Sequence, residues 1–451
     1  MEDTIAAIAT PSGQGAVALL RMSGHKAIDV ADKIFRSPRG LVSGFPQRVQ
    51  MLGDIVDAEN RRIDQVLLTV FRAPASYTGE DIVEISAHGG ILVARAVLDV
   101  LVEAGARPAD PGEFTRRAFL NGKMDLTQAE AVMDLISART SLALRAANRQ
   151  LEGKLGDRVN WLREELLAVL AHLEAYIDFP EEGIDPDNSQ IIYERLLEVS
   201  SASRRLIDTA EEGRILREGF KVVIAGLPNA GKSSLLNLML GFERAIVSDV
   251  EGTTRDTIEE MINVRGVPVR LVDTAGLRNA SEQVEREGVS RARREVEGAD
   301  LVLQVVDCSL AREQSEGSVP EVAGDGECRI FVLNKVDLGV HSTWEKVEGV
   351  RISCSKQTGM NSLRDSIFEA AGLEAFDSGS EMAAVNARHR DCLEQACIFT
   401  EKAAEVLKSG ESPEYVAIDL REALDAVGSI VGKVDAEEVL GEIFSSFCIG
   451  K

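Results

Sequence analysis

The residues whose types and spacing suggest chemistry most directly lie in one segment, Gly226-Leu-Pro-Asn-Ala-Gly-Lys-Ser233. This spacing of glycines before Lys-Ser is typical of loops whose backbone N–H groups surround phosphates. A strand pattern precedes the segment and a helix pattern follows it, so the positive end of a helix dipole would also face the phosphates. We expect Lys232 to contact the β- and γ-phosphates and Ser233 to bind Mg²⁺.

Three further short segments follow at the ends of expected strands. Asp273-Thr-Ala-Gly276 has an Asp that can hold Mg²⁺ through water and a Gly N–H that can sense the γ-phosphate. Asn334-Lys-Val-Asp337 offers a carboxylate that can accept paired N–H donors from guanine, which adenine lacks, and Ser353-Cys-Ser355 would lie beneath the base. Each segment alone also fits an ordinary loop. Together they occupy the edge where open α/β sheets bind ligands, and the set predicts a GTPase and not an ATPase.

The expected switch loop, Ser248-Asp-Val-Glu-Gly-Thr-Thr-Arg-Asp256, lies between the phosphate-binding segment and Asp273-Thr-Ala-Gly276. Thr254 would close onto Mg²⁺ when the γ-phosphate is present. Leu277 stands where Ras-like enzymes carry the glutamine that orients the attacking water, so hydrolysis needs another acid and another positive charge. The acids that follow, among which the spacing does not choose, are Glu282, Glu285 and Glu287.

The expected GTP contacts therefore come from five stretches of the chain. They are Asn229, Ala230, Gly231, Lys232, Ser233 and Ser234; Ser248, Asp249, Val250, Glu251, Gly252, Thr253 and Thr254; Asp273, Thr274, Ala275 and Gly276; Asn334, Lys335, Val336 and Asp337; and Ser353, Cys354 and Ser355. Ser233 and Thr254 are the expected Mg²⁺ ligands among them.

The hydrophobic pattern around these segments divides the chain into four regions. Residues 1–118 mix short β-rich runs with a helix pattern near Ile91–Glu103, which predicts an α+β domain. Residues 119–215 and 377–451 have helical spacing, whereas residues 216–376 alternate apolar strands with helices, as parallel sheets do. The simplest interpretation is an all-α helical domain interrupted by an inserted α/β P-loop domain of the Ras-like class.

This division into regions depends on a limited set of apolar segments with strand or helix spacing. The expected strands are Thr4–Thr10, Ala16–Met22, Gln65–Arg72, Asp81–Ser86, Val222–Ala225, Val269–Val272, Leu301–Val306 and Ile330–Leu333. The expected helix faces include Leu126, Ala129, Val132, Met133 and Ile136, and then Leu162, Leu166, Leu167 and Leu170. Pro180, Gly183 and Pro186 predict a loop between helical stretches.

The composition restricts partners and location. The chain has 451 residues with 50 Lys and Arg against 74 Asp and Glu, a formal net charge of −24, so a nucleic acid must meet a local basic patch. Aromatic residues make up 4%, which argues against a stacking platform for single strands. No run has the length of a membrane span, the start does not resemble a secretory signal, and six scattered cysteines favour a reduced cytoplasmic protein.

Several longer segments resemble the MnmE/TrmE family of tRNA-modifying GTPases. They are DTIAAIATPSGQGAVALLRMSG, YTGEDIVEISAHGG, RPADPGEFTRRAFLNGKMDLTQAEA, GLPNAGKSSLLN, IVSDVEGTTRD, DTAGLR and the final FCIGK. The resemblance extends over essentially the whole chain in the family's order. It implies a tetrahydrofolate-binding and dimerisation domain in residues 1–118, a helical domain in residues 119–215 and 377–451, and a GTP-binding domain in residues 216–376.

The resemblance also implies a function. The family acts as a homodimer with an FAD-dependent partner, MnmG (GidA), in a heterotetramer, and it modifies C5 of wobble uridine 34 in certain tRNAs. An aminomethyl or carboxymethylaminomethyl group is added, and its one-carbon unit comes from 5-formyl- or 5,10-methylene-tetrahydrofolate. GTP hydrolysis drives a conformational cycle, and the expected location is the cytoplasm.

Matched by position, the resemblance assigns a K⁺ site to Asn229, Ser248, Val250 and Thr253, formed when two G domains meet. A monovalent cation there supplies the charge that an arginine finger brings in other GTPases. The resemblance also selects Glu285 as the acid that orients the attacking water, a choice that the spacing left open.

For folate, the matching positions are Arg21, Glu84, Lys123 and Lys451. A carboxylate can accept paired donors from a pterin ring, and cations can meet carbonyl and carboxylate oxygens. Cys448 lies three residues before Lys451, where both a catalytic and a structural role of the thiol are compatible with the sequence.

Departures from the family pattern are small. Ser248 stands where Thr is commoner and keeps a hydroxyl and a carbonyl for K⁺, and Ser353-Cys-Ser stands where Ser-Ala-Lys is usual.

Two other functions remain as alternatives: a ribosome-assembly or RNA-binding GTPase, and a folate-dependent methyl-transfer enzyme with a regulatory GTPase. The first class usually carries a compact basic module, whereas the appended regions here are acidic or mixed.

Overall fold

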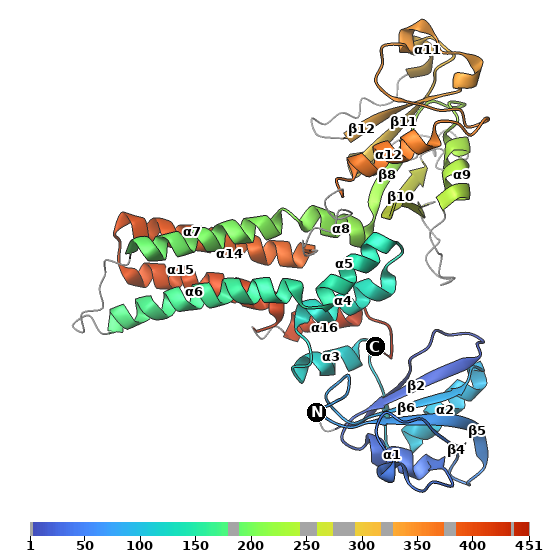
Figure 1. Cartoon of the computed structure of the whole chain (residues 1–451), viewed down its shortest axis with the longest axis vertical. Coiled ribbons are helices and arrows are strands. Elements are labelled where there is room, and N and C mark those ends of the chain that lie inside the picture. The colour runs from blue at the N-terminus through green and yellow to red at the C-terminus, as the bar shows by residue number, and fades with distance from the viewer. Residues whose placement is uncertain are drawn as a thin grey trace, which may run out of the picture. The chain divides into compact units, whose positions relative to one another are not determined.

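The structure, a computed structural model, describes residues 3–178, 189–243, 259–273, 294–316, 328–373, 385–433 and 437–450 (Figure 1). The chain forms two compact units, one made of Met1–Met133 and Gly428–Lys451 and the other of Asp134–Val427. The first unit therefore contains both ends of the chain. Within the described ranges, no helix combines the length and the apolar character that crossing a membrane needs.

The N-terminal part of the first unit is a seven-stranded sheet in the order β3-β4-β5-β6-β2-β1-β7. Neighbouring strands are antiparallel except β1 and β7, which are parallel. The strands are β1 (Ile5–Ile8), β2 (Val17–Ser23), β3 (Phe35–Arg36), β4 (Met51–Val56), β5 (Arg62–Phe71), β6 (Ile82–His88) and β7 (Arg107–Pro108). The expected strands in this region are confirmed. The additional strand β4 has a broken apolar pattern because Gly53 lies against Phe35, where an added Cβ would be 2.3 Å from the ring.

Helices α1 (Ala27–Ile34) and α2 (Ile91–Glu103) bury one face of this sheet, together with the short 3₁₀ helix Val42–Gly44. Alternate strand residues such as Met22, Leu68 and Ile85 are buried beneath them. The period of two along each strand turns the intervening residues, among them Arg21 and Glu84, to the opposite face of the sheet.

The end of the chain completes the first unit. This part contains α3 (Glu113–Leu120), the start of α4 (Leu126–Ser137) and α16 (Glu437–Ser445). Phe444 and Phe447, with ring centroids 5.4 Å apart, pack against Leu126 and Ala129 of α4. The helix expected around Leu126 is therefore confirmed, and its apolar face holds the C-terminal segment.

The helical part of the second unit combines segments from both sides of the inserted region. It contains α5 (Ser141–Leu151), α6 (Lys154–Asp178), α7 (Ser189–Ile207), α8 (Ala210–Glu218), α14 (Ala387–Ser409) and most of α15 (Pro413–Val431). α7 lies alongside α14 (Figure 1), and Ser200 Oγ donates a hydrogen bond of 2.5 Å to Glu401 Oε1. The insertion that the change of pattern predicts is thus confirmed, while the loop expected at Pro180 lies outside the described residues.

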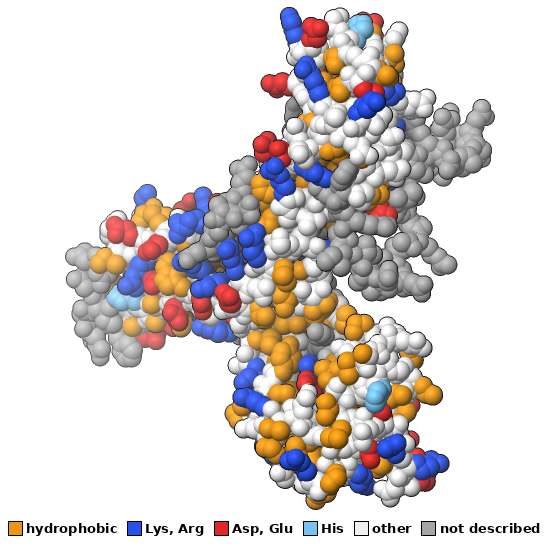
Figure 2. All heavy atoms as spheres, turned by 45° about the vertical axis from the view of Figure 1, so that its right-hand side comes forward, with side chains coloured by type: hydrophobic (Ala, Val, Ile, Leu, Met, Phe, Trp, Pro, Cys, Tyr) orange, Lys and Arg blue, Asp and Glu red, His pale blue; other side chains and the backbone are white. Residues whose placement is uncertain are grey.

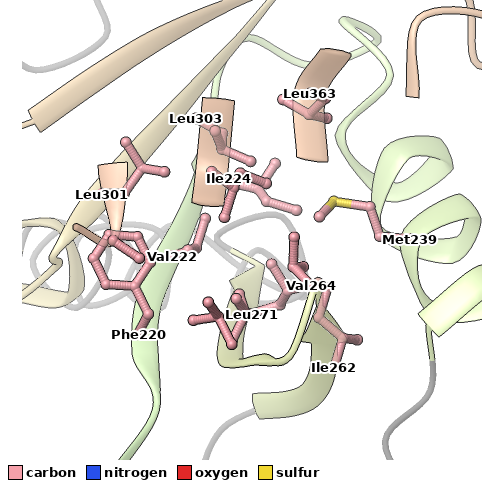
Figure 3. Close-up of a cluster of buried hydrophobic side chains, with 14 of the residues drawn as sticks. Phe220, Val222, Ile224, Met239, Ile262, Val264, Leu271, Leu301, Leu303 and Leu363 are labelled. Atoms are coloured by element: carbon pink, nitrogen blue, oxygen red, sulfur yellow. The ribbon is translucent and has the colours of Figure 1, made fainter. Parts of the chain in front are cut away.

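The inserted region contains a six-stranded sheet in the order β13-β12-β11-β8-β10-β9. Its strands are β8 (Phe220–Ala225), β9 (Glu259–Val264), β10 (Val267–Asp273), β11 (Leu301–Asp307), β12 (Cys328–Asn334) and β13 (Val350–Arg351), and its helices are α9 (Lys232–Glu243), α11 (Arg312–Glu316) and α12 (Met360–Ala370), with 3₁₀ helices at Val336–Leu338 and Ser342–Trp344. All neighbours are parallel except β9 and β10. Figure 3 shows the apolar core, where strand residues such as Ile224 and Leu303 lie near Met239 of α9 and Leu363 of α12. The expected α/β fold is confirmed.

Candidate functional site

The candidate nucleotide site lies at one edge of the parallel sheet. β8, β11, β12 and β13 run in the same direction, so their carboxyl ends meet at this edge. The phosphate loop follows β8, Asn334 ends β12 and Ser353 follows β13. The structure therefore brings together three of the segments that sequence reasoning selected.

The phosphate loop has the backbone that a close approach to phosphate needs. Gly226 has a φ of +148° and Gly231 a φ of +103°, a region that favours glycine. An added Cβ would lie 2.2 Å from Val305 O at the first position and 2.1 Å from Asn334 Nδ2 at the second. Asn229 also has a positive φ, of +65°. The glycines are therefore required by packing as well as by the turn.

Lys232 begins α9 and is buried. Its Nζ donates to Gly226 O at 3.0 Å and to Leu227 O at 2.9 Å. The ammonium group is thus held within the loop, next to the backbone N–H groups at the start of the helix, which is the arrangement that binds polyphosphate.

Asn334 connects the phosphate loop to the side of the site that would hold the base. It is buried, its Nδ2 donates to Ala230 O at 2.9 Å, and its Oδ1 accepts from Cys354 N at 3.2 Å. The side chain therefore joins three segments of the site, a role that the spacing alone did not indicate.

Asp337 is prepared as a hydrogen-bond acceptor. Ser353 Oγ donates to its Oδ1 at 2.6 Å and Ser355 Oγ donates to its Oδ2 at 3.0 Å. The hydrogen bond from Ser353 is the main cause that lowers the pKa of Asp337. Between the serines, burial raises the pKa of the Cys354 thiol to about 11, so this residue is a neutral packing group. The oriented carboxylate suits the N–H donors of guanine.

These groups line a pocket of about 760 Å³. The lining consists of Pro228, Asn229, Gly231, Lys232, Ser233, Ser234, Asn334, Lys335, Asp337, Leu338, Cys354 and Ser355. Phosphate-binding groups and base-recognition groups thus share one pocket whose volume is that of a small-molecule site, which is typically about 300–1,000 Å³.

Asp307 is a site residue that sequence reasoning missed. Lys335 Nζ donates to its Oδ2 at 2.6 Å, and Ser309 Oγ donates to its Oδ1 at 2.6 Å. Although burial raises it, these hydrogen bonds lower the pKa of Asp307 overall. Asp307 therefore fixes the long side chain of Lys335. The feature that could have indicated this role is the position of Asp307 at the end of β11, where it pairs in register with Asn334 of β12.

Part of the expected site lies outside the described residues. This part comprises Ser248, Asp249, Val250, Glu251, Gly252, Thr253, Thr254, Thr274, Ala275, Gly276, Leu277, Glu282, Glu285, Glu287, Lys451 and the side chain of Asp273. The role of Thr254 toward Mg²⁺, the switch-loop share of the K⁺ site and the role of Glu285 therefore stay predictions.

A second candidate site lies on the N-terminal sheet, on the face opposite α1 and α2. Arg21 and Glu84 are partners in register, and Arg21 donates from Nε and Nη2 to Glu84 Oε1 at 2.9 and 2.7 Å. Their side chains are 21% and 23% exposed, so the pair remains accessible to a ligand. Two of the four residues expected to bind folate are thus in direct contact.

Two aromatic rings flank the Arg21 guanidinium. Arg21 Cζ lies 5.7 Å from the Tyr77 ring centroid and 5.9 Å from that of Phe114. The Tyr77 hydroxyl forms a hydrogen bond of 2.9 Å with Thr115 Oγ1, and burial raises the pKa of Tyr77. Sequence reasoning quoted the YTGED segment but did not select Tyr77, whose contact with Arg21 depends on the tertiary structure.

The other two expected folate residues are less completely placed. Lys123 Nζ donates to Pro74 O at 3.1 Å, in the loop that carries Tyr77, and it has no hydrogen bond or ion pair with Arg21 or Glu84 among the described contacts. Lys451 is outside the described residues, but Gly450 approaches β1, where an added Cβ would be 2.7 Å from Ile8 O. The tail therefore lies beside the strand that pairs with β2.

A buried ion network supports the loop that carries Tyr77. The Arg117 side chain is fully buried and forms ion pairs with Asp3, Glu80 and Glu113 at 2.9, 3.1 and 2.9 Å. Glu80 belongs to the loop and also accepts from Ser23 Oγ at 2.8 Å. Burial raises the pKa of Glu113, but hydrogen bonds from Arg107 and Arg117 lower it overall. The network ties the loop to α3 and to β2.

The parallel sheet, the phosphate loop and the guanine-directed Asp337 at the same edge define a P-loop GTPase of the Ras-like class. Two family models match the chain, "GTP-binding protein TrmE N-terminus" over residues 4–123 and "MnmE helical domain" over residues 126–448. The chain belongs to the MnmE family of tRNA modification GTPases, as the resemblance predicted, and it is therefore a GTP hydrolase.

Curated relatives named tRNA modification GTPase MnmE are similar to this chain over its whole length. The protein named tRNA modification GTPase MnmE from Akkermansia muciniphila is 50% identical and covers 100% of this chain and 99% of its own. The proteins of the same name from Aquifex aeolicus and Bacillus subtilis are each 43% identical, with 100% of both chains covered. A solved structure of Aquifex aeolicus Era bound to GDP·AlF4⁻ is 26% identical over 41% of this chain and 66% of that chain, with a TM-score of 0.28.

Proposed function

We propose that this GTPase acts with the FAD-dependent protein MnmG to add an aminomethyl or carboxymethylaminomethyl group to C5 of wobble uridine 34 in certain tRNAs. The one-carbon unit would come from 5-formyl- or 5,10-methylene-tetrahydrofolate, in the cytoplasm, where tRNA is found. The observation that carries this proposal is the presence of two separate sites in one chain, a guanine-nucleotide pocket and the accessible Arg21–Glu84 pair.

The residues of the nucleotide pocket support separate roles in binding the phosphates, the base and Mg²⁺. The glycines of the phosphate loop let backbone N–H groups approach the phosphates, Lys232 offers an ammonium group to them, and Asp337 accepts from the guanine edge. Ser233 lines the pocket next to Lys232, which suits a hydroxyl ligand for Mg²⁺. We assign the orientation of the attacking water to Glu285 and the second Mg²⁺ contact to Thr254.

The same pocket fits the proposed K⁺ site in part. Asn229 lines it and offers, from within the loop that surrounds the phosphates, an amide oxygen, a ligand type that alkali cations accept. Ser248, Val250 and Thr253 would complete the ligand set when two G domains face each other. When bound, K⁺ would add positive charge against the phosphates, the role that an arginine finger has in other GTPases.

The Arg21–Glu84 pair fits the proposed folate. Both hydrogen bonds of the pair go to Glu84 Oε1, so Oε2 can accept from a pterin amide edge. Lys123 and Lys451 would meet the more distant oxygens of the ligand. A folate also presents a flat ring, which suits the aromatic surroundings of Arg21.

Exposed apolar residues support a homodimer through the N-terminal sheet. Figure 2 shows hydrophobic side chains gathered on the N-terminal part of the molecule. Leu52 and Leu67 are 57% and 37% exposed, and they pair in register on the face that carries Arg21 and Glu84. Such a surface is expected at an interface. We propose that a second copy covers it and that MnmG completes a heterotetramer.

A reconstitution tests the proposal. The purified chain, MnmG, folate, GTP and an unmodified tRNA are incubated together, and the nucleosides are then analysed by mass spectrometry. We expect a modified uridine 34 that requires all components. Unmodified uridine combined with an altered ribosome profile in a deletion strain would favour a ribosome-assembly GTPase, and loss of a methyl group alone would favour a methyl-transfer enzyme.

A further inference from the structure

We propose that the corner between α5 and α6, residues 139–163, binds the phosphate backbone of tRNA. The inference rests on the tRNA-modifying function proposed above and names the surface that takes the substrate. It starts from the charge of the molecule, because a chain with a net charge of −24 repels a polyanion unless the two meet at a local basic surface.

The α5–α6 corner has the opposite charge to the molecule as a whole. Residues 139–163 contain six Lys or Arg against two Asp or Glu. The cations are Arg139, Arg145, Arg149, Lys154, Arg158 and Arg163. Five of these cations lie on the consecutive helices α5 and α6, and Arg139 lies just before α5. A tight turn at Gly153, with a φ of +86°, joins the two helices.

Helical spacing places Arg145, Lys154 and Arg158 on the exposed side of their helices, and Arg149 and Arg163 are half-buried. Leu142 and Ala146 of α5, and Leu155 and Val159 of α6, are buried and face the interior of the second unit. Arg145 and Arg149 of α5 are four residues apart, and so are Lys154 and Arg158 of α6. Four residues correspond to about 6 Å along a helix axis, so each pair of cations shares one face.

Lys154 and Arg158 are the residues of this surface that are best placed to contact phosphate. Both are exposed, and neither forms an ion pair with any residue in the described part of the chain. By contrast, Arg204, Arg214 and Arg217 of the same unit each pair with a carboxylate at 2.5–2.6 Å. Cations that no acid neutralises, in a chain with excess acid, are available to phosphate oxygens.

Trp161 adds a second feature to this face. It is half-buried and follows Arg158 by three residues, which places the two side chains on the same side of α6. An indole beside paired cations offers an apolar surface to a nucleotide, while the cations contact its backbone. The combination favours RNA over an acidic protein as the partner.

The test compares two matched double variants of the full-length chain. Lys154→Gln with Arg158→Gln removes two cations from the corner, and Arg61→Gln with Arg62→Gln removes two from an exposed strand end, where the side chains are 74% and 65% exposed. Binding of an unmodified tRNA transcript is measured by fluorescence anisotropy over a range of KCl concentrations, with and without MnmG. GTP hydrolysis without tRNA, which we expect to be unchanged, reports that both variants are folded.

We expect the corner variant to bind tRNA about tenfold more weakly, and its plot of log affinity against log salt to be less steep by roughly one to two, since each lost phosphate contact removes about 0.7–0.9 from the slope. The control variant should keep both values. Equal losses in the two variants, or unchanged tRNA binding with weakened binding of MnmG, would overturn the assignment. A wild-type chain that binds no tRNA with or without MnmG would instead contradict the proposed function itself.

Discussion

Single residues of the nucleotide pocket depend on neighbours that hold them in place. Asn334 reaches the phosphate loop and the segment at Cys354 at once, and Asp307 fixes Lys335. Asp337 is oriented by two serines that lie 16 and 18 residues further along the chain. Substitutions that change one group and keep the fold therefore separate base recognition from phosphate binding.

Asp337→Asn should weaken GTP binding by roughly tenfold to a hundredfold, because an amide replaces a charged acceptor with a donor at one position. The hydrogen bond from Ser353 lowers the pKa of Asp337, so in the wild type the carboxylate stays ionised as the pH falls below the usual value of 3.8. Affinities for GTP and xanthosine triphosphate, measured by calorimetry, check this prediction. Leu338→Ala, which changes an exposed residue of the pocket lining, serves as the control. If Asp337→Asn kept the wild-type ratio of the affinities for GTP and xanthosine triphosphate, the proposed role of the carboxylate would be contradicted.

At the second site, Tyr77→Leu should weaken binding of 5-formyl-tetrahydrofolate by roughly twofold to fivefold, whereas Tyr77→Phe should bind nearly as well as the wild type. Leucine keeps bulk but removes the ring that flanks the Arg21 guanidinium, and such a contact contributes about 0.5–1 kcal/mol. Calorimetric titration gives the affinities. If Tyr77→Leu were equally harmful in an Arg21→Ala background, the ring would not act through Arg21.

At the scale of elements, the parallel strands bring the loops to one edge and the glycines let them approach. The phosphate loop crosses the end of β11, where Gly226 lies against Val305 O. In the N-terminal sheet, the register of β2 and β6 sets Arg21 beside Glu84, and the ion network of Arg117 holds the adjacent loop. Each of these arrangements can be broken by one substitution.

Gly226→Ala should greatly reduce GTP binding, because the new Cβ would lie 2.2 Å from Val305 O in a backbone conformation that disfavours alanine. Gly241→Ala is the matched control, since an added Cβ meets no atom within 4 Å in the described structure and alanine favours a helix. Equilibrium binding of a fluorescent GTP analogue compares the two. Equal affinities would show that β11 can move away at little cost.

Arg117→Met should destabilise the N-terminal sheet by about 3 kcal/mol, because it removes a cationic partner from the buried Glu113 and the half-buried Glu80. The lowered pKa of Glu113 means that its pairing contributes stability above its usual pKa of 4.5, and that this stability is lost as the pH falls through that value and below it. The wild type should therefore lose hydrogen-exchange protection in β1 and β6 as the pH falls through about 4.5 and below. The variant should show a smaller pH dependence. Arg95→Met, on the exposed face of α2, should behave as the wild type does.

At the scale of the whole molecule, we propose that a second copy of the chain contributes to each site. The expected K⁺ ligands are divided between Asn229, which lines the pocket, and the switch loop, and the proposed site forms when two G domains meet. The Arg21–Glu84 pair lies on the same sheet face as the exposed Leu52 and Leu67. Both activities are therefore expected to depend on assembly.

GTP hydrolysis should be faster in KCl than in NaCl at equal ionic strength, and the rate per chain should rise with protein concentration. The physical reason is that, in the proposed site, the cation binds when two G domains face each other and adds positive charge against the phosphates. Asn229→Ala should lose the preference for K⁺ and still bind GTP. Phosphate release assays measure the rates, and equal rates in the two salts would count against a K⁺ site.

Features that depend on near neighbours could be predicted from residue types and spacing. The phosphate loop, the strand-ending segments, the strand and helix patterns and the insertion of one domain into another follow from residue types a few positions apart, since turns, strands and helices are local structures. The resemblance to the MnmE family added the folate positions, of which Arg21 and Glu84 lie in direct contact.

Contacts between residues far apart in the chain became known from the three-dimensional fold. Arg21 meets Glu84 across 63 positions, Asn334 meets Ala230 across 104, and Arg117 meets Asp3 across 114. Strand register and helix packing set these distances, and neither has a signature within a short window of sequence. For the same reason the roles of Asp307 and Tyr77 could not be predicted, since each depends on a partner that folding alone brings within reach.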